Sequence, residues 1–205
     1  EAYDDGDADF HTIVAKMADI PRSAAKTINL GLFYGMGKAK LQAELGVSKD
    51  KAEELFSIYH NRVPFVRSLT KSVSNRAQQR GQIRTLLGRL CRFHLWEPNT
   101  FGMHKALPFE QAVQEHGPGI KRAYTYKALN KLIQGSAADM TKKSMLDLYK
   151  EGIVAHIQIH DELDVSVESP EQAKKIVEIM ENAVKLEIPN KVDYESGKNW
   201  GSIND

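Results

Sequence analysis

Hydrophobic residues recur at helical spacing through the first eighty positions of the chain. Pro21 suits the first turn of a helix, and the run from Arg22 to Tyr34 keeps a helical pattern until two glycines interrupt it. Ser48 can cap a second helix, whose apolar residues follow at i, i+3, i+4 and i+7. A third helix is predicted from about Phe65 to Arg80, with a glycine as its terminator. The pattern therefore predicts a helical subdomain.

The middle of the chain has no clean period. Residues 94–119 contain three prolines and three glycines, and we interpret them as a long irregular connection, of a length that is often functional or mobile. From Ile120 to about Lys150 the helical pattern returns, with an interruption at Gly135. We therefore expect two regions, 1–119 and 120–205.

Beyond Gly152 the period changes from helical to alternating. Apolar residues alternate between Ile153 and Val167, which predicts two strands joined by a turn at residues 160–162. A serine followed by a proline then predicts a capped helix over 169–186, and a final strand is expected near 191–194. The predicted fold class is α+β, with an antiparallel β-hairpin flanked by helices in the second half.

Composition narrows the class of protein. The chain has 205 residues, 41% of them hydrophobic, which is enough to bury a real core. Cys91 is the only cysteine, so an internal disulfide framework and a zinc ribbon are excluded. The sequence has no apolar run of the ~18 residues that span a bilayer, and it starts with acidic residues where a signal peptide would be basic. We expect a soluble, untargeted protein of a reducing compartment.

The net charge of +1 hides a strongly basic segment. Between Lys71 and Trp96 there are six cations and no acidic residue. The cations are Lys71, Arg76, Arg80, Arg84, Arg89 and Arg92. Arginine offers a planar donor fork to phosphate oxygens and keeps its charge, so the segment suits a phosphate-rich partner. Taken alone, the spacing favours the plainer interpretation, a solvated and charged helix face.

A stripe of four residues spaced by four lies in the first predicted helix. Arg22, Lys26, Leu30 and Tyr34 share one slowly drifting face. Two cations in the first two turns of a helix, where the helix dipole already favours anions, suit a triphosphate. Tyr34 lies roughly 18 Å from Arg22 along the helix, about the reach of a nucleotide from terminal phosphate to base. As an isolated pattern, Arg and Lys four positions apart more often form a solvent-facing pair than a binding site.

A pair of acidic residues occupies the turn of the predicted hairpin. Asp161 and Glu162 are adjacent there, and Mg²⁺ is bound through only one or two protein carboxylates plus substrate phosphates. The pair therefore suits phosphoryl transfer, although a lone Asp-Glu pair is more often an ordinary polar turn. Together, a cationic helix and a carboxylate hairpin are the two halves of a nucleotidyl-transfer site.

These motifs resemble those of the DNA polymerase I family (family A). Arg22-(x3)-Lys26-(x7)-Tyr34-Gly35 is similar to the family's fingers helix, and Gln158-Ile159-His160-Asp161-Glu162-Leu163 is similar to its palm hairpin. Three further segments occur in the family's order: Asp9 to Thr12, Arg84 to Arg89, and Asn130-(x3)-Gln134 to Asp139. The resemblance covers nearly the whole chain, with a phage-like connection around Leu95 to Pro98.

The resemblance implies template-directed DNA synthesis by two-metal nucleotidyl transfer, with primer-template DNA and deoxynucleoside triphosphates as partners and Mg²⁺ as the cofactor. It also assigns roles to residues. The implied catalytic residues are Asp161, Glu162 and Lys26, and the two carboxylates are also the implied metal ligands. The implied nucleotide-binding residues are Arg22, Lys26, Leu30, Tyr34 and Gly35. The implied DNA-binding residues are Arg76, Arg80, Arg84, Arg89, Asn130, Gln134 and His160, of which Asn130 and Gln134 would read the minor groove.

The chain departs from the family pattern in two respects. The family's first palm motif, a strand with the other essential aspartate, should precede Asp9 and is absent from these residues. We therefore expect the chain to form the fingers and the second half of the palm. We expect it to be inactive alone and to be completed by an N-terminal polymerase portion. The expected location is the cytoplasm of a phage-infected bacterium. Leu30 stands where the family usually has an aromatic residue, which puts sugar discrimination in question.

Two other functions remain open from the sequence. A single-subunit phage RNA polymerase shares the Arg-(x3)-Lys-(x7)-Tyr-Gly spacing, but Glu162 and the run from Gln134 to Asp139 favour a DNA polymerase. A non-catalytic module that binds primer-template or nucleotide is the third hypothesis. Replacing Asp161 would separate it from an enzyme, because binding alone should survive.

Overall fold

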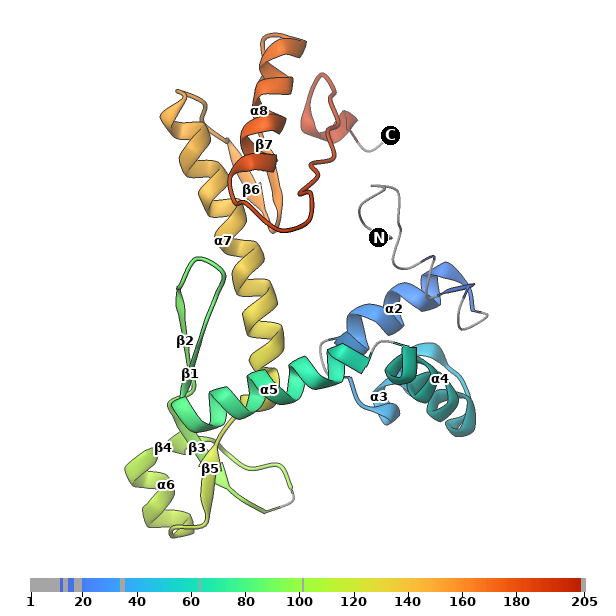
Figure 1. Cartoon of the computed structure of the whole chain (residues 1–205), viewed down its shortest axis with the longest axis vertical. Coiled ribbons are helices and arrows are strands. Elements are labelled where there is room, and N and C mark those ends of the chain that lie inside the picture. The colour runs from blue at the N-terminus through green and yellow to red at the C-terminus, as the bar shows by residue number, and fades with distance from the viewer. Residues whose placement is uncertain are drawn as a thin grey trace. The chain divides into compact units, whose positions relative to one another are not determined.

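The computed structural model describes residues 12, 15, 16, 20–33, 36–62, 64–100 and 102–203 (Figure 1). The chain forms two compact units, and the boundary between them falls between Gly135 and Ser136. This boundary lies inside the longest helix, α7 (Ala128–Lys150). Each unit is described by itself below.

Between residues 22 and 80 the described part of the chain forms four helices, of which the periodicity predicts three. They are α2 (Arg22–Phe33), α3 (Lys38–Leu45), α4 (Lys49–Arg62) and α5 (Pro64–Arg80). The missed helix is α3, which has only eight residues and buries a single side chain, Leu41. The predicted cap of α4 is present, because the Ser48 hydroxyl accepts a hydrogen bond from the Lys51 N–H at 3.2 Å. One core joins these helices through Ile28, Leu32, Leu41, Leu55, Tyr59 and Val66.

Two small antiparallel sheets follow α5. Strands β1 (Gln82–Arg84) and β2 (Leu90–Arg92) form a hairpin that lies beside α7 (Figure 1). The second sheet has the order β4-β3-β5, from β3 (Leu95–Pro98), β4 (Leu107–Pro108) and β5 (Ile120–Arg122). Helix α6 (Phe109–His116) connects β4 with β5.

The expectation of an irregular connection over 94–119 is therefore wrong. The segment holds two strands and a helix, and β3 pairs with β5 from Trp96↔Arg122 to Pro98↔Ile120. Strands of two to four residues are too short to show a period, and the pairing of β3 with β5 joins segments more than twenty positions apart. The helix expected from Ile120 is also wrong at its start, because β5 and a 3₁₀ turn, η1 (Thr125–Lys127), precede α7.

The second unit contains the predicted hairpin. Strand β6 (Ile157–Ile159) pairs with β7 (Glu162–Asp164), and α8 (Pro170–Asn182) follows. Its core consists of Leu148, Ile153 and Ile176, with Leu163 of β7 packed against them. The Ser169 hydroxyl accepts from the Gln172 N–H at 3.2 Å, which confirms the predicted cap.

The final strand expected near 191–194 does not form. Residues 191–197 have no regular secondary structure, and the Val192 N–H donates to a side chain, Glu181 Oε1, at 3.1 Å. A strand needs a neighbouring strand to receive its backbone hydrogen bonds. Here a carboxylate of α8 takes that place. A 3₁₀ turn, η2 (Trp200–Ser202), follows near the end of the chain.

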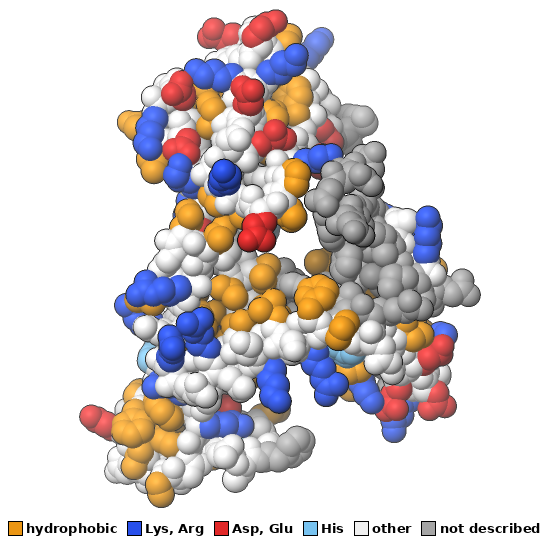
Figure 2. Space-filling view, in the orientation of Figure 1, with side chains coloured by type: hydrophobic (Ala, Val, Ile, Leu, Met, Phe, Trp, Pro, Cys, Tyr) orange, Lys and Arg blue, Asp and Glu red, His pale blue; other side chains and the backbone are white. Residues whose placement is uncertain are grey.

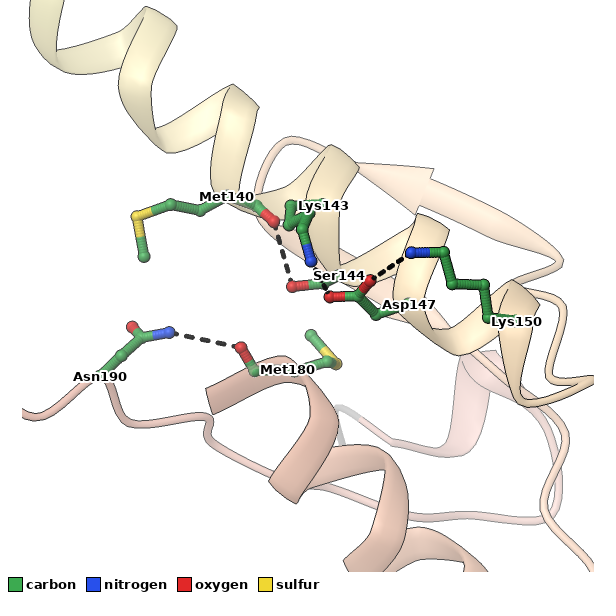
Figure 3. A network of polar contacts seen from close by, with 7 residues as sticks. All are labelled: Met140, Lys143, Ser144, Asp147, Lys150, Met180 and Asn190. Atoms are coloured by element: carbon green, nitrogen blue, oxygen red, sulfur yellow. Dashed lines mark hydrogen bonds and ion pairs between the residues drawn. The ribbon is translucent and has the colours of Figure 1, made fainter. Parts of the chain in front are cut away.

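Polar contacts fix the end of α7 and the start of the segment after α8 (Figure 3). Asp147 accepts from both Lys143 and Lys150, and the bond from Lys143 contributes most to holding the pKa of Asp147 below its ordinary value of 3.8. The Asn190 amide donates to the Met180 carbonyl oxygen at 3.5 Å, so the chain beyond α8 turns back onto that helix. Within the part that the structure describes, no helix is long and apolar enough to cross a membrane.

Candidate active site

Helix α2 presents the predicted nucleotide-binding stripe to solvent. Arg22, Lys26 and Leu30 are exposed, Leu30 to 44%, while residues 25, 28, 29 and 32 on the other side are buried. Positions four apart rise by about 6 Å, so the two cations lie in the first two turns of the helix. Tyr34, the fourth member of the stripe, and Gly35, the other implied nucleotide-binding residue, lie outside the described residues.

The β6–β7 hairpin carries the predicted carboxylates at its tip. Ile159 pairs with Glu162, so His160 and Asp161 form a two-residue turn. His160 has φ = 50°, a left-handed conformation that few non-glycine residues adopt, and the Gln158 side chain donates to its carbonyl oxygen at 2.7 Å. Leu163 anchors β7 in the core, and Asp161 and Glu162 are exposed. The turn therefore places both carboxylates in solvent on an anchored and strained support.

The structure adds one contact that sequence reasoning missed. The Trp200 indole N–H donates to Glu162 Oε1, with 3.4 Å between the nitrogen and the oxygen. Trp200 itself is about half exposed. The two residues are 38 positions apart, and no local pattern in the sequence links them.

The hairpin carboxylates fit a magnesium ion. Each offers oxygen ligands, which Mg²⁺ prefers, and the ion needs only one or two protein carboxylates when water and substrate phosphates complete its octahedral shell. Among the described residues no group of three His, Cys, Asp or Glu side chains could hold a metal. Asp161 and Glu162 are only two carboxylates, so other groups would have to supply the remaining ligands of a metal bound there.

Two of the four arginines expected to contact phosphate donate hydrogen bonds to backbone carbonyl oxygens of the chain itself. Arg89 Nη2 donates to the Gly135 carbonyl oxygen at 2.7 Å, and Arg84 Nη1 donates to the Gly88 carbonyl oxygen at 2.9 Å. The first bond fastens the β1–β2 turn to α7. A Cβ atom on Gly135 would lie 2.8 Å from Thr85 Cγ2, so only glycine allows this close approach. The expected helix break at Gly135 is wrong, because α7 runs straight through it.

The other predicted DNA contacts lie on two helices. Arg76 and Arg80 are exposed one turn apart on α5, and Asn130 and Gln134 are one turn apart on α7. Gln134 is exposed, and Asn130 is half-buried. On the face drawn in Figure 2, Lys and Arg side chains lie over α5 and the β1–β2 hairpin, acidic side chains gather over α4, and acidic and basic side chains are mixed over α8.

Comparison with known proteins decides the family. The model of DNA polymerase family A matches residues 1–202. The chain belongs to DNA polymerase family A. A DNA-directed DNA polymerase of Pseudomonas phage M6 is 32% identical over 231 residues, covering 96% of this chain and 32% of the relative. The thermostable DNA polymerase I of Thermus filiformis is 32% identical over 186 residues, covering 87% of this chain and 20% of the relative.

A solved family A structure shares the fold. It is described as the POL domain of Pol1 from M. smegmatis in complex with DNA primer-template and dNTP, and it matches with a TM-score of 0.77 at 27% identity. The match covers 100% of this chain and 36% of that chain. This family A chain therefore spans about a third or less of the relatives described here. The resemblance inferred from the sequence motifs, including the phage-like relative, is confirmed.

Proposed function

We propose that this chain supplies the fingers and part of the palm of a polymerase that adds deoxynucleotides to the 3′ end of a DNA primer. The observation that carries the proposal is the β6–β7 hairpin, which carries Asp161 and Glu162 at adjacent, exposed positions directly after the left-handed His160. Family A membership supports the same reaction, because the relatives are named DNA polymerases.

The proposed site residues have two kinds of role, binding the nucleotide and holding the metal. Arg22 and Lys26 would hold the triphosphate, since both are exposed cations near the positive end of the α2 dipole. Asp161 would be the principal ligand of Mg²⁺, with Glu162 as the weaker one. When bound, the metal neutralises charge on the triphosphate and activates the attacking primer oxygen. Tyr34 with Gly35 would adjoin the templating base pair, and Leu30 would contact the sugar.

The DNA would follow the cationic and amide side chains of α5 and α7. Arg76 and Arg80 are the strongest candidates for phosphate contacts. Arg84 and Arg89 are weaker candidates, because each donates a hydrogen bond to a backbone carbonyl oxygen of the chain itself. Asn130 and Gln134 would donate to minor-groove acceptors, which recur at every correct base pair and so read geometry rather than sequence. His160 would lie near the primer end.

The metal site requires a contribution from outside the hairpin. Two carboxylates leave most of the octahedral positions of Mg²⁺ to other ligands, and a two-metal site needs carboxylates that bridge both ions. We propose that an N-terminal polymerase portion carrying the first palm motif supplies the other aspartate, and that the 205 residues alone do not extend a primer.

Primer extension with a labelled primer-template tests the proposal. The chain is assayed alone and with the N-terminal portion of the same polymerase, with deoxynucleotides and ribonucleotides in parallel. We expect extension only with the added portion and with deoxynucleotides, and a KM for dNTP raised at least about tenfold by Lys26→Ala. Lys40→Ala, an exposed lysine on α3, is the matched control. Extension with ribonucleotides alone, or an unchanged KM in Lys26→Ala, would contradict the proposal.

A further inference from the structure

Trp200 contacts the hairpin carboxylate through its one polar atom. The indole N–H can only donate, and here it donates to Glu162 Oε1 at 3.4 Å. Within the described residues this is the hydrogen bond that the Glu162 carboxylate makes, and its second oxygen stays open. The contact therefore constrains one oxygen of Glu162 and leaves the other available to a ligand.

The turn that carries Trp200 is closed on itself. The Asn199 side chain accepts from the Ser202 N–H at 3.1 Å, and the Ser202 hydroxyl accepts from the Asn199 N–H at 3.3 Å. These reciprocal bonds form a capping box around η2. A Cβ atom on Gly197 would lie 2.7 Å from Ser202 Oγ, so the chain passes close to the turn there. The indole is thus presented to Glu162 by a locally fixed segment.

The two tryptophans of the chain differ in their surroundings. The Trp96 ring has the Arg122 guanidinium 4.5 Å from its centroid and the Phe109 ring 5.0 Å away, as expected of a packing residue. The Trp200 ring is 49% exposed. Trp200 is therefore too exposed to serve mainly as a packing residue. The hydrogen bond to Glu162 is what distinguishes it from Trp96.

We propose that Trp200 is a positioning residue that holds the Glu162 carboxylate in the orientation needed to bind a divalent cation beside Asp161. This inference rests on the proposed function. A glutamate side chain loses considerable rotamer freedom when it is fixed, and a bond made beforehand reduces that cost at the moment of metal binding. Hydrogen-bond partners of metal-binding carboxylates typically contribute 10- to 100-fold to metal affinity.

Mn²⁺ binding to the completed polymerase, in which the N-terminal portion supplies the other ligands, is measured by calorimetry and tests this role. Trp200→Phe keeps a ring and removes the N–H, and we expect it to weaken Mn²⁺ binding about tenfold. Trp96→Phe is the matched control and should leave the Mn²⁺ affinity within about twofold. In a Glu162→Gln background, Trp200→Phe should have no further effect, because the two residues act together. A loss of similar size in both backgrounds would show a merely structural role and overturn the inference.

A spectroscopic signal of the contact completes the test. In the Trp96→Phe chain the indole N–H of Trp200 gives a single tryptophan cross-peak in a ¹H–¹⁵N correlation spectrum, which should shift on Glu162→Gln and broaden with Mn²⁺. If the cross-peak neither shifts on Glu162→Gln nor broadens with Mn²⁺, the role of Trp200 is refuted while the proposed function stands. The same holds if Trp200→Phe and the unmodified protein bind Mn²⁺ equally well. Mn²⁺ binding unaffected by Asp161→Asn, or absent altogether, overturns the metal site and thereby the proposed function.

Discussion

Gly135 allows two separate segments of the chain to meet, and replacing it with alanine tests that contact. Its Cβ atom would lie 2.8 Å from Thr85 Cγ2 and 3.4 Å from Arg89 Nη2. Thr85 is buried, and its hydroxyl accepts from the Arg89 N–H at 3.0 Å, so the methyl group cannot simply rotate away. Gly135→Ala must therefore push the β1–β2 turn away from α7.

The size of the effect follows from two opposing contributions. Alanine is favoured over glycine in a helix interior by about 1 kcal/mol, whereas overpacking costs about 1–3 kcal/mol. Gly135→Ala should thus lower the free energy of unfolding by about 1 kcal/mol. Thr85→Ser keeps the hydroxyl, removes the obstructing methyl and should cost about 1 kcal/mol by itself. In the double variant the new methyl fills the vacated space, so we expect stability near that of the unmodified chain.

The assay is urea unfolding of the four proteins followed by far-ultraviolet circular dichroism. We expect a coupling free energy of about 2 kcal/mol between Gly135→Ala and Thr85→Ser, which is large enough to measure reliably. Additive effects of the two substitutions would refute the reasoning, because they would mean that the two methyl groups never compete for the same space.

Three further predictions concern the second unit. Ser169→Ala removes the cap of α8 and should lower the free energy of unfolding by about 1 kcal/mol in urea, whereas Ser166→Ala, an exposed serine just before it, should change little. Because its lysine partners lower the pKa of Asp147, the ionised carboxylate stabilises the fold above pH 3.8 and this contribution is lost as the pH falls through the lowered value; Asp147→Asn should therefore flatten the acid limb of a stability-against-pH curve, and an unchanged limb would contradict the ion-pair assignment. His160→Gly should raise the free energy of unfolding by up to about 1 kcal/mol because it relieves the left-handed backbone, whereas His160→Ala keeps the strain and should give no gain in the same urea experiment.

The helices that the sequence predicted correctly have their start and stop signals within a few residues of their ends. Helices α4 and α8 each begin after a serine that caps them, and α5 ends before Gly81, where φ is positive. The small sheet of β3, β4 and β5 could not be predicted, because its strands are very short and β3 pairs with β5 across more than twenty positions. The helix break predicted at Gly135 was wrong because the low helix propensity of glycine is visible in the local sequence. The hydrogen bond from Arg89 to the Gly135 carbonyl oxygen comes from a hairpin distant in the sequence and is not.

The candidate site divides in the same way. The hairpin that carries Asp161 and Glu162 followed from the alternation of its strands, which is a local signal, although the turn is His160–Asp161 and Glu162 already belongs to β7. The exposure of Arg22, Lys26 and Leu30 followed from their four-residue spacing on α2. The Trp200 contact with Glu162 joins residues far apart in the chain, and only the folded structure brings them together.

The central claim is that Asp161 serves the chemical step rather than DNA binding. The most direct test is single-turnover incorporation of one dNTP by the completed polymerase, with primer-template affinity measured on the same samples. Asp161→Asn should slow incorporation at least about a thousandfold, a loss of about 4 kcal/mol in transition-state stabilisation, and leave primer-template affinity unchanged. Asp193→Asn, an exposed aspartate in the same unit, should behave like the unmodified protein. Full incorporation rates in Asp161→Asn would contradict the assignment of the active site to this hairpin.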